Sequence, residues 1–161
     1  MQVSKAGDYA LRAVIFLSRQ APGRLATIGE IARAQQIPQA FLAKLMPMLI
    51  RGGVVNSVQG PKGGYRLARR PAEISFLDVL QAIEGPISLV TCQDDGGCCD
   101  FEPFCTMNEV FAEAQRRLAE FFRTTTFADL PVQPCCTVTD EKLKRGLAEL
   151  LPAPALPQEK R

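Results

Sequence analysis

The part of the chain that decides the fold is residues 54–67, which read Val54-Val55-Asn56-Ser57-Val58-Gln59-Gly60-Pro61-Lys62-Gly63-Gly64-Tyr65-Arg66-Leu67. Residues 54–59 predict a β-strand because they are rich in valine and end at turn-forming residues. Residues 60–64 combine glycines with a proline, which predicts a turn. Residues 65–67 predict the returning strand, so the segment is expected to form a β-hairpin with a glycine-rich, basic tip.

Three helices are expected before this hairpin. The first covers residues 8–20, where apolar residues recur at helical spacing. The second begins at the capping box Thr27-Ile28-Gly29-Glu30. The third begins at Pro38, a residue suited to a first helical turn, and ends at Gly52-Gly53. Three helices followed by a hairpin predict a mostly α-helical fold with a small β-hairpin, the winged helix-turn-helix.

A long helix is expected in the second half of the chain. Ser75 begins a short helix, and a second capping box, Thr106-Met107-Asn108-Glu109, begins the long one. A stripe on one face of the long helix is apolar: Val110, Ala114, Leu118, Phe121 and Phe122. Such a stripe outside a compact domain needs a partner, and a symmetric homodimer is the usual solution. The alternative is that the helix packs back on the first domain.

Composition excludes several classes of protein. The 161 residues hold six cysteines and no histidine, which removes histidine ligands and histidine-based catalysis. No apolar run is long enough to span a membrane and no leader peptide is visible, so we expect a cytoplasmic, reducing location. Cysteines are then more often metal-binding than structural. We expect no enzyme; a small redox metalloenzyme is the weakest alternative, because no nucleotide-binding glycine pattern follows a strand.

Charge is divided unequally between the two halves of the chain. Residues 1–70 carry 11 Lys/Arg and 2 Asp/Glu, whereas residues 71–161 carry 8 and 15. A basic half joined to an acidic half suggests that the basic end meets a polyanion. Combined with the expected fold, this predicts that the first domain binds double-stranded DNA.

The expected DNA contacts lie on the third helix and on the hairpin. The N-terminal turns of a recognition helix enter the major groove, where Gln39 can bond adenine and Ala40 can touch a thymine methyl. Lys44 is suited to a phosphate, and the glycine-rich tip of the hairpin can probe the minor groove. The full set of DNA-binding candidates is Gln39, Ala40, Phe41, Lys44, Ser57, Gln59, Pro61, Lys62, Gly63 and Arg66.

Four of the cysteines lie in one loop, Cys92-Gln-Asp-Asp-Gly-Gly-Cys98-Cys99-Asp-Phe-Glu-Pro-Phe-Cys105. Structural zinc sites use paired Cys-x-x-Cys knuckles, which are absent here. Iron–sulfur clusters accept wider spacing, and either Cys99 or Cys98 can join Cys92 and Cys105. Cys105 precedes a helix, whose dipole favours its thiolate. The loop predicts a cluster with one iron left for a weaker ligand; a disulfide formed in air is the alternative.

We therefore expect four parts: a winged helix-turn-helix DNA-binding domain at 1–84, a cluster-binding cysteine loop at 85–105, a dimerisation helix at 106–130 and a C-terminal tail at 131–161. Within the tail, residues 140–151 have the pattern of a short helix. Cys135 and Cys136 are read as exposed thiols, and a redox-active pair is the alternative.

Four stretches resemble a known family: residues 5–12 (Lys-Ala-Gly-Asp-Tyr-Ala-Leu-Arg), residues 60–67, residues 88–92 (Ser-Leu-Val-Thr-Cys) and the thiol loop. Together they resemble the Rrf2 family of winged-helix regulators, which has IscR-, NsrR- and RirA-like members, over roughly residues 1–130. The resemblance implies a homodimer joined along the long helix, with the cluster loop near the partner's DNA-binding domain.

The resemblance also implies a ligand set. IscR-like proteins hold a two-iron cluster with three cysteines and a following histidine, which is absent here. NsrR-like proteins hold a four-iron cluster, in some with an N-terminal aspartate, and Asp8 matches that position. The implied ligands are Cys92, Cys99 (Cys98 as its alternative), Cys105 and Asp8, on a 4Fe-4S cluster with 2Fe-2S as the alternative. Asp8 at the start of a helix is equally suited to be its N-cap.

The expected function is a DNA-binding transcriptional repressor that senses nitric oxide, redox or iron status through the cluster. The alternative is a cluster-free regulator of the same fold that responds through its thiols or through a partner protein. Gln59 stands where IscR-like proteins have an arginine that reads the minor groove. A different target sequence is therefore expected.

Overall fold

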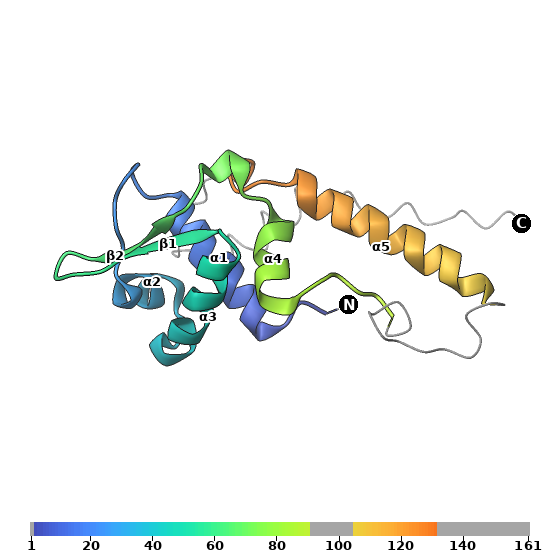
Figure 1. Cartoon of the computed structure of the whole chain (residues 1–161), viewed down its shortest axis with the longest axis horizontal. Helices are drawn as coiled ribbons and strands as arrows, with labels where there is room; N and C mark the ends of the chain where they lie inside the picture. The colour runs from blue at the N-terminus through green and yellow to red at the C-terminus, as the bar shows by residue number, and fades with distance from the viewer. Residues whose placement is uncertain (1, 91–104, 132–161) are drawn as a thin grey trace, which may run out of the picture. The chain divides into compact units, whose positions relative to one another are not determined.

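The structure is a computed structural model that describes residues 2–90 and 105–131 (Figure 1). It is mostly helical with one two-stranded antiparallel sheet, as the sequence predicts. The elements run α1 (Lys5–Ser18), α2 (Ile28–Gln35), α3 (Gln39–Arg51), β1 (Val55–Val58), β2 (Gly64–Leu67), η1 (Pro71–Glu73), α4 (Phe76–Glu84) and α5 (Thr106–Thr124).

Residues Met1–Leu130 form one compact unit. The expected tail helix at 140–151 lies outside the described residues, as do five of the six cysteines: Cys92, Cys98, Cys99, Cys135 and Cys136. Among the described helices, none is long and apolar enough to cross a membrane.

Side-chain caps fix where three of the helices begin. Ser4 Oγ accepts from the Gly7 backbone N–H at 3.2 Å, so α1 begins at Lys5, three residues before the predicted start. Asp8 consequently lies in the first turn and is not the N-cap. The capping box predicted at Thr27 is confirmed, with both reciprocal hydrogen bonds to Glu30. Ser75 caps α4 in the same way.

The core of the first domain is built from the inner faces of α1, α2, α3 and α4. Its largest fully buried side chains come from every one of these helices, from the chain around β1 and from the segment just before α4: Ile31, Leu42, Met46, Leu49, Ile74, Leu80, Val14, Val54, Val55 and Val79. Burying a side chain of this size contributes about 1.5–3 kcal/mol. The core therefore fixes the orientation of α3, whose opposite face is left exposed.

The hairpin gains a third backbone partner. β1 pairs with β2 in the register Val55↔Leu67 to Val58↔Gly64. Ala26 then pairs with Tyr65 through two hydrogen bonds of 3.0 and 2.8 Å, which extends the sheet across β2. A Cβ on Gly64 would lie 2.7 Å from the Ala26 carbonyl oxygen, so glycine is needed there for the strands to approach.

The long helix begins at Thr106, but the predicted capping box is wrong. Cys105 is the N-cap, without a side-chain hydrogen bond, and the Thr106 backbone is already helical. The Asn108 N–H donates to the Cys105 carbonyl at 3.2 Å, so the first turn closes through backbone atoms. None of the 19 residues of α5 is buried.

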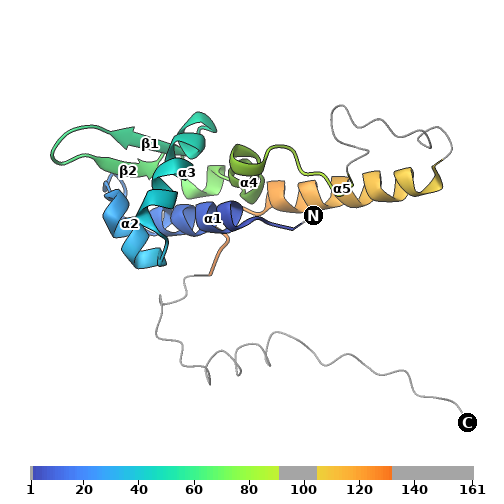
Figure 2. The same cartoon turned by 90° about the horizontal axis from the view of Figure 1, so that it is seen from below.

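After α5 the chain returns to the first domain. Phe127 is 3% exposed, and its N–H donates to the Ile74 carbonyl at 3.2 Å, while the Phe76 N–H donates to Thr125 at 3.0 Å. The Phe76 ring stacks on Phe127 at 4.9 Å and on Phe122 at 6.5 Å. Figure 2 shows the end of α5 running into this junction beside α4. The helix expected at 106–130 thus ends at Thr124. The alternative that it packs back on the first domain applies to its last turn, where Phe122 meets Phe76.

Candidate nucleic-acid interface and cysteine site

The turn between α2 and α3 directs α3 outward. Gln36 adopts a left-handed conformation at φ 52, and the Ile37 N–H bonds back to the Ala32 carbonyl at 2.9 Å. Ile37 itself is buried, which ties the turn to the core. Pro38 is the N-cap and the helix begins at Gln39, one residue after the predicted start. This is the turn of a helix-turn-helix, in which the second helix is presented to DNA.

All four candidates on α3 lie on its exposed side. The structure classes Gln39, Ala40, Phe41 and Lys44 as exposed. Phe41 is 38% exposed and also packs edge-on against Tyr9, so it belongs partly to the core. The first two turns of α3 thus present an amide, a methyl group, a ring and a cation to solvent.

The hairpin candidates are exposed with one exception. Ser57, Gln59, Pro61, Lys62 and Arg66 are all exposed, whereas Gly63 is partly buried. A Cβ on Gly63 would lie 2.2 Å from the Val58 carbonyl oxygen. Sequence reasoning explained this glycine by close approach to DNA. The structure shows instead that the tight turn of the hairpin itself requires it.

Three cations on this surface differ from the two arginines at the base of the hairpin. In the part of the chain that the structure describes, Lys44, Lys62 and Arg66 form no ion pair. Arg69 and Arg70, at the base of the hairpin, are paired with Asp78 and Glu73. Unpaired cations on an exposed surface remain available to phosphates, whereas the paired ones serve the fold.

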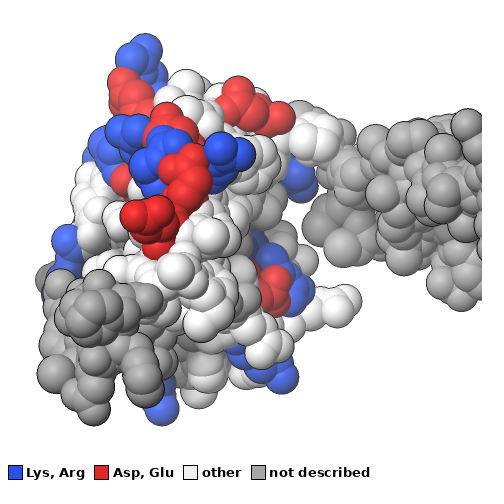
Figure 3. Space-filling view, turned by 90° about the vertical axis from the view of Figure 1, so that its right-hand side faces the viewer, with Lys and Arg blue, Asp and Glu red and all other residues white. Residues whose placement is uncertain are grey.

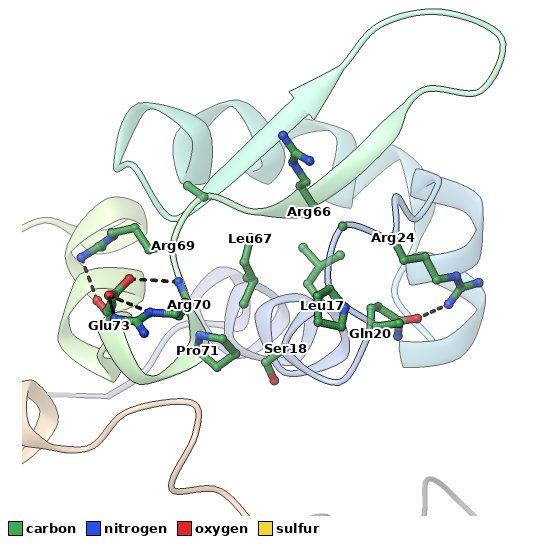
Figure 4. A pocket seen from close by; sticks show the side chains of 14 residues that line it. Leu17, Ser18, Gln20, Arg24, Arg66, Leu67, Arg69, Arg70, Pro71 and Glu73 are labelled. Carbon is green, nitrogen blue, oxygen red and sulfur yellow. Dashed lines mark hydrogen bonds and ion pairs between the residues drawn. The ribbon is translucent and has the colours of Figure 1, made fainter.

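A groove of about 590 Å³ lies between the end of α1 and the chain after β2 (Figure 4). Leu17 is in its lining, and Arg70 is bound to Glu73 at one side. Arg24 at the other side bonds to the side chains of Gln20, which follows α1, and of Glu30 in α2. Figure 4 shows Arg66 directed away from the apolar floor. The arginines around this groove therefore do not converge on a common ligand.

Two of the predicted metal ligands lie within the described residues. Cys105 is a free, partly buried thiol at the start of α5. Asp8 is exposed on α1, with its carboxylate 3.4 Å from the Arg12 guanidinium. In residues 2–90 and 105–131 no three Cys, Asp or Glu side chains gather into a metal-sized group. Cys92, Cys98 and Cys99 lie outside the described residues.

The beginning of α5 is well separated from α1 within one chain. In Figures 1 and 2, α5 begins at the end of the compact unit that lies farthest from α1. Gln115 accepts a hydrogen bond from the Leu89 N–H at 3.1 Å. Cys105 precedes Gln115 by ten residues, or about 15 Å of helix. The structure does not bring Cys105 and Asp8 of the same chain together.

Comparisons with known proteins agree with this geometry. The Rrf2 family model, described as an iron-dependent transcriptional regulator, matches residues 3–133. The Azotobacter vinelandii protein ORF2, described as an HTH-type transcriptional regulator, is 31% identical over 130 residues, covering 81% of this chain and 79% of its own.

Two solved structures illustrate the shared fold. CymR of B. subtilis, the global cysteine regulator, has a TM-score of 0.66 at 26% identity, covering 80% of this chain and 95% of its own. IscR of T. potens has a TM-score of 0.64 at 22% identity, covering 99% and 94%. These relatives and this fold are those of transcriptional regulators and not of enzymes. The chain belongs to the Rrf2 family of transcriptional regulators.

Proposed function

We propose that the chain is a homodimeric repressor that reads an operator with α3 and the hairpin and senses its signal through an iron–sulfur cluster. The observation that carries the DNA-binding part is that candidate groups on both elements are exposed, from Gln39 on α3 to Lys62 at the tip of the hairpin, and that the cations among them form no ion pair within the described residues. The two elements are expected to make different kinds of contact, because the major and minor grooves present different chemical groups.

The recognition helix supplies the base contacts. Gln39 can donate to and accept from an adenine edge, and Ala40 can contact a thymine methyl. Lys44, one turn further on, reaches a phosphate, which positions the helix without reading sequence. The hairpin supplies contacts from the neighbouring groove, where Gln59 bonds base edges and Lys62 neutralises phosphates.

DNA binding is tested by the salt dependence of affinity. A duplex selected by the protein from a random-sequence library serves as the operator. Lys44→Gln and Lys62→Gln each lower the slope of log affinity against log salt by about one. Gln39→Ala changes which base is preferred and leaves the slope unaltered. An unaltered slope in both lysine variants would contradict the docking.

The proposed dimer uses α5. Large apolar side chains on this helix are exposed in the single chain: Met107 at 63%, Val110 at 66% and Phe121 at 63%. Figure 3, which looks at the end where α5 begins, shows mixed acidic and basic side chains beside a broad uncharged surface. Large apolar side chains exposed along one helix are a candidate interaction surface. Symmetric pairing of two copies covers it on both chains at once.

The proposed cluster ligands are Cys92, Cys99 (or Cys98), Cys105 and Asp8. The chemistry of the described donors suits an iron–sulfur group: a free thiol at a helix start, and an exposed carboxylate on α1. Three thiolates and one oxygen ligand favour a 4Fe-4S cluster with one labile iron. The family's description as iron-dependent supports iron as the metal. The cluster supplies a site that nitric oxide, oxygen or iron scarcity can damage.

Asp8 would join this site from the partner subunit. Within one chain the start of α5 lies well away from α1 (Figure 1). Pairing two α5 helices would carry the cysteine loop of one chain towards the first domain of the other. The ligand set would then bridge the subunits, so that loss of the cluster is felt directly by a DNA-binding domain.

The cluster is tested by purifying the protein without oxygen and measuring its visible absorption, iron and sulfide. A brown protein with about four irons per chain supports the proposal. Cys105→Ala abolishes the absorption, and Asp8→Ala makes the cluster more labile. The matched control is Cys135→Ala with Cys136→Ala, which removes two thiols and leaves the cluster intact. A colourless, iron-free wild-type protein refutes the cluster.

A cluster-free regulator is the second candidate. The likeness to the global cysteine regulator CymR, at 26% identity, favours it. In that case the chain responds through its thiols or a partner protein. Iron-free protein that binds the selected duplex with full affinity, and loses that affinity when its thiols are oxidised, would support this candidate over the cluster.

A further inference from the structure

One arginine at the base of the hairpin contacts three separate parts of the chain. The Arg69 guanidinium donates from Nη1 to the backbone carbonyl of Glu73 at 2.8 Å and from Nε to that of Gly53 at 3.4 Å (Figure 4 shows the contact with Glu73). Its Nη2 donates to the Asp78 carboxylate at 3.2 Å. Gly53 precedes β1, Arg69 itself follows β2, and Asp78 lies in the first turn of α4. Arg69 therefore joins both ends of the hairpin to α4.

The Asp78 carboxylate is held in place by the beginning of α4. Its Oδ2 accepts from the Ser75 backbone N–H at 2.9 Å as well as from Arg69. The Asp78 N–H in turn donates to the Ser75 hydroxyl at 3.1 Å, and Ser75 pairs with Thr126 in the segment after α5. The partner of Arg69 is thus fixed by a capping box, so it offers the guanidinium a defined position.

A close packing contact brings the end of α3 to the same helix. A Cβ on Gly52 would lie 2.6 Å from the Ala82 Cβ, so α3 and α4 meet there without room for a further side chain. Gly52 is the C-cap of α3, and the next residue is Gly53, to which Arg69 bonds. Helix α4 therefore contacts the start of the hairpin at two neighbouring residues, one by packing and one through Arg69.

Beyond its base the hairpin is mostly exposed. Strand β1 has one buried residue, Val55, and β2 has none. The pairing of Ala26 with Tyr65 supports β2 from one side. A two-stranded hairpin has little stability of its own. Its direction consequently depends on the residues that fix its base.

We propose that Arg69 is a positioning residue for DNA recognition, which holds the hairpin at the angle that lets Lys62 reach DNA while α3 lies in the major groove. The proposal rests on the proposed docking of these two elements. A guanidinium carries five N–H donors in a planar fork, which suits three acceptors in different directions. Because these contacts hold the guanidinium against the fold, Arg69 acts through the hairpin and not as a phosphate contact.

The proposal is tested with the full-length protein and its selected duplex, by combining substitutions at Arg69 and Lys62. Lys62→Gln alone lowers the slope of log affinity against log salt by about one. Arg69→Gln alone is expected to lower the affinity about fivefold and the slope by about one, because Lys62 no longer reaches its phosphate. The two substitutions together should still lower the slope by about one, since both remove the same contact.

A double variant whose slope falls by about two would show that Arg69 itself binds a phosphate, and would overturn the proposal. Wild-type affinity and slope in Arg69→Gln would overturn it as well. Failure of the wild type to select any duplex, or an unaltered slope in Lys62→Gln alone, would instead refute the proposed function on which the proposal rests.

Arg70 provides the matched control for charge. Its guanidinium bonds to the Glu73 carboxylate at 2.9 Å, within the same short turn. Arg70→Gln removes an equal charge one residue further along, and it should leave affinity and slope unaltered because an exposed ion pair contributes little. If Arg70→Gln matches Arg69→Gln, the effect comes from net charge, which overturns the proposal.

Lys44 provides the control for docking of α3. Added to Arg69→Gln, Lys44→Gln should lower the slope by about one more, because α3 remains in its groove when the hairpin is released. If Lys44→Gln causes no further fall, Arg69→Gln has disturbed the whole interface and not the hairpin alone. That result would overturn the proposal.

A thermal melt decides whether Arg69→Gln is folded. Since the Arg69 side chain is 42% exposed and Asp78 36%, the substitution leaves no fully buried charge unpaired. If the variant nevertheless unfolds, Asp78→Asn carries the test, because it weakens the hold on Arg69 and keeps an oxygen for the Ser75 N–H. Its slope should fall, and adding Lys62→Gln should change it less than in the wild type. An unchanged or steeper slope in Asp78→Asn would overturn the proposal.

Discussion

The first domain and α5 bury their apolar side chains in opposite ways. Helices α1 to α4 hold a shared core in which residues such as Leu42 and Val79 are fully buried. Helix α5 is the longest helix in the described ranges, yet it buries none of its residues. Its charges pair along the helix, as Glu113 does with Arg116 and Arg117. The core of the first domain is buried within one chain, with Phe127 from beyond α5 included, whereas under the proposed function α5 buries its exposed face against a second copy.

The largest expected effect comes from Phe127, where α5 is joined to the core. Phe127→Ala should destabilise the chain by about 3–5 kcal/mol, because a buried ring stacked on Phe76 is replaced by a cavity. Urea unfolding at several protein concentrations measures it. The destabilisation should not depend on concentration, since the contact lies within one chain. A loss below about 1 kcal/mol would show that the return segment is not part of the core.

Phe121, six residues earlier, provides the matched contrast. Phe121→Asp should raise the dimer dissociation constant by about thirtyfold or more, the effect of removing an interface hot spot. Unlike Phe127→Ala, it should leave the helical content of the first domain intact. Sedimentation over a range of concentrations distinguishes the two. A Phe121→Asp protein that sediments like the wild type would contradict the pairing of α5.

Two glycines sharpen the comparison within the first domain. Gly63→Ala should cost about 1–3 kcal/mol, because its Cβ would meet the Val58 backbone and not a movable side chain. Gly29→Ala in α2 should stabilise by about 0.4–1 kcal/mol, since the nearest atom is Gln39 Oε1 at 3.8 Å. Denaturant midpoints of both variants check the prediction. If both substitutions stabilised the protein, or both destabilised it, the packing described for the hairpin would be contradicted.

The smallest expected effect is a pH dependence at the start of α2. The Thr27 backbone N–H and hydroxyl donate to Glu30, which lowers the pKa of this carboxyl below 4.5. Because the folded pKa is the lower one, the stabilisation is present above the unfolded pKa. It is lost as the pH falls through the folded pKa. The difference in unfolding midpoint between wild type and Glu30→Gln should shrink from pH 7 to pH 3. A constant difference would mean that the charge of Glu30 is unimportant.

Sequence predicted the parts of the fold that depend on neighbouring residues. The capping box at Thr27, the hairpin and the start of α4 at Ser75 are each decided within a few positions. The capping box predicted at Thr106 is wrong, because the Thr-x-x-Glu pattern can also occur one residue after the N-cap, within the helix itself. There the Cys105 backbone closes the first turn and the threonine is already helical.

Contacts between distant residues could not be predicted. Ala26 pairs with Tyr65, which is 39 residues away in the sequence. Phe127 packs into a core whose other buried residues all precede residue 85. The bond from Arg12 to Gln35 likewise has no local signal. At the candidate site, all the α3 and hairpin candidates except Gly63 are exposed. The sequence explained Gly63 by close approach to DNA, whereas the structure explains it by close packing inside the hairpin. Both situations favour glycine, so the residue type alone does not distinguish them.

The aromatic junction of Phe76, Phe122 and Phe127 has a mechanical consequence. It clamps α5 near its last turn, so the 19 residues act as a lever arm about 28 Å long. A rotation of about 5° at the junction moves the opposite tip by about 2.4 Å over that length. Conversely, a displacement of the N-terminal end of α5 is transmitted through the aromatic junction to α4 and to the core of the first domain. In the proposed homodimer, a small displacement at the cysteine end of α5 would therefore change the spacing between the two recognition helices.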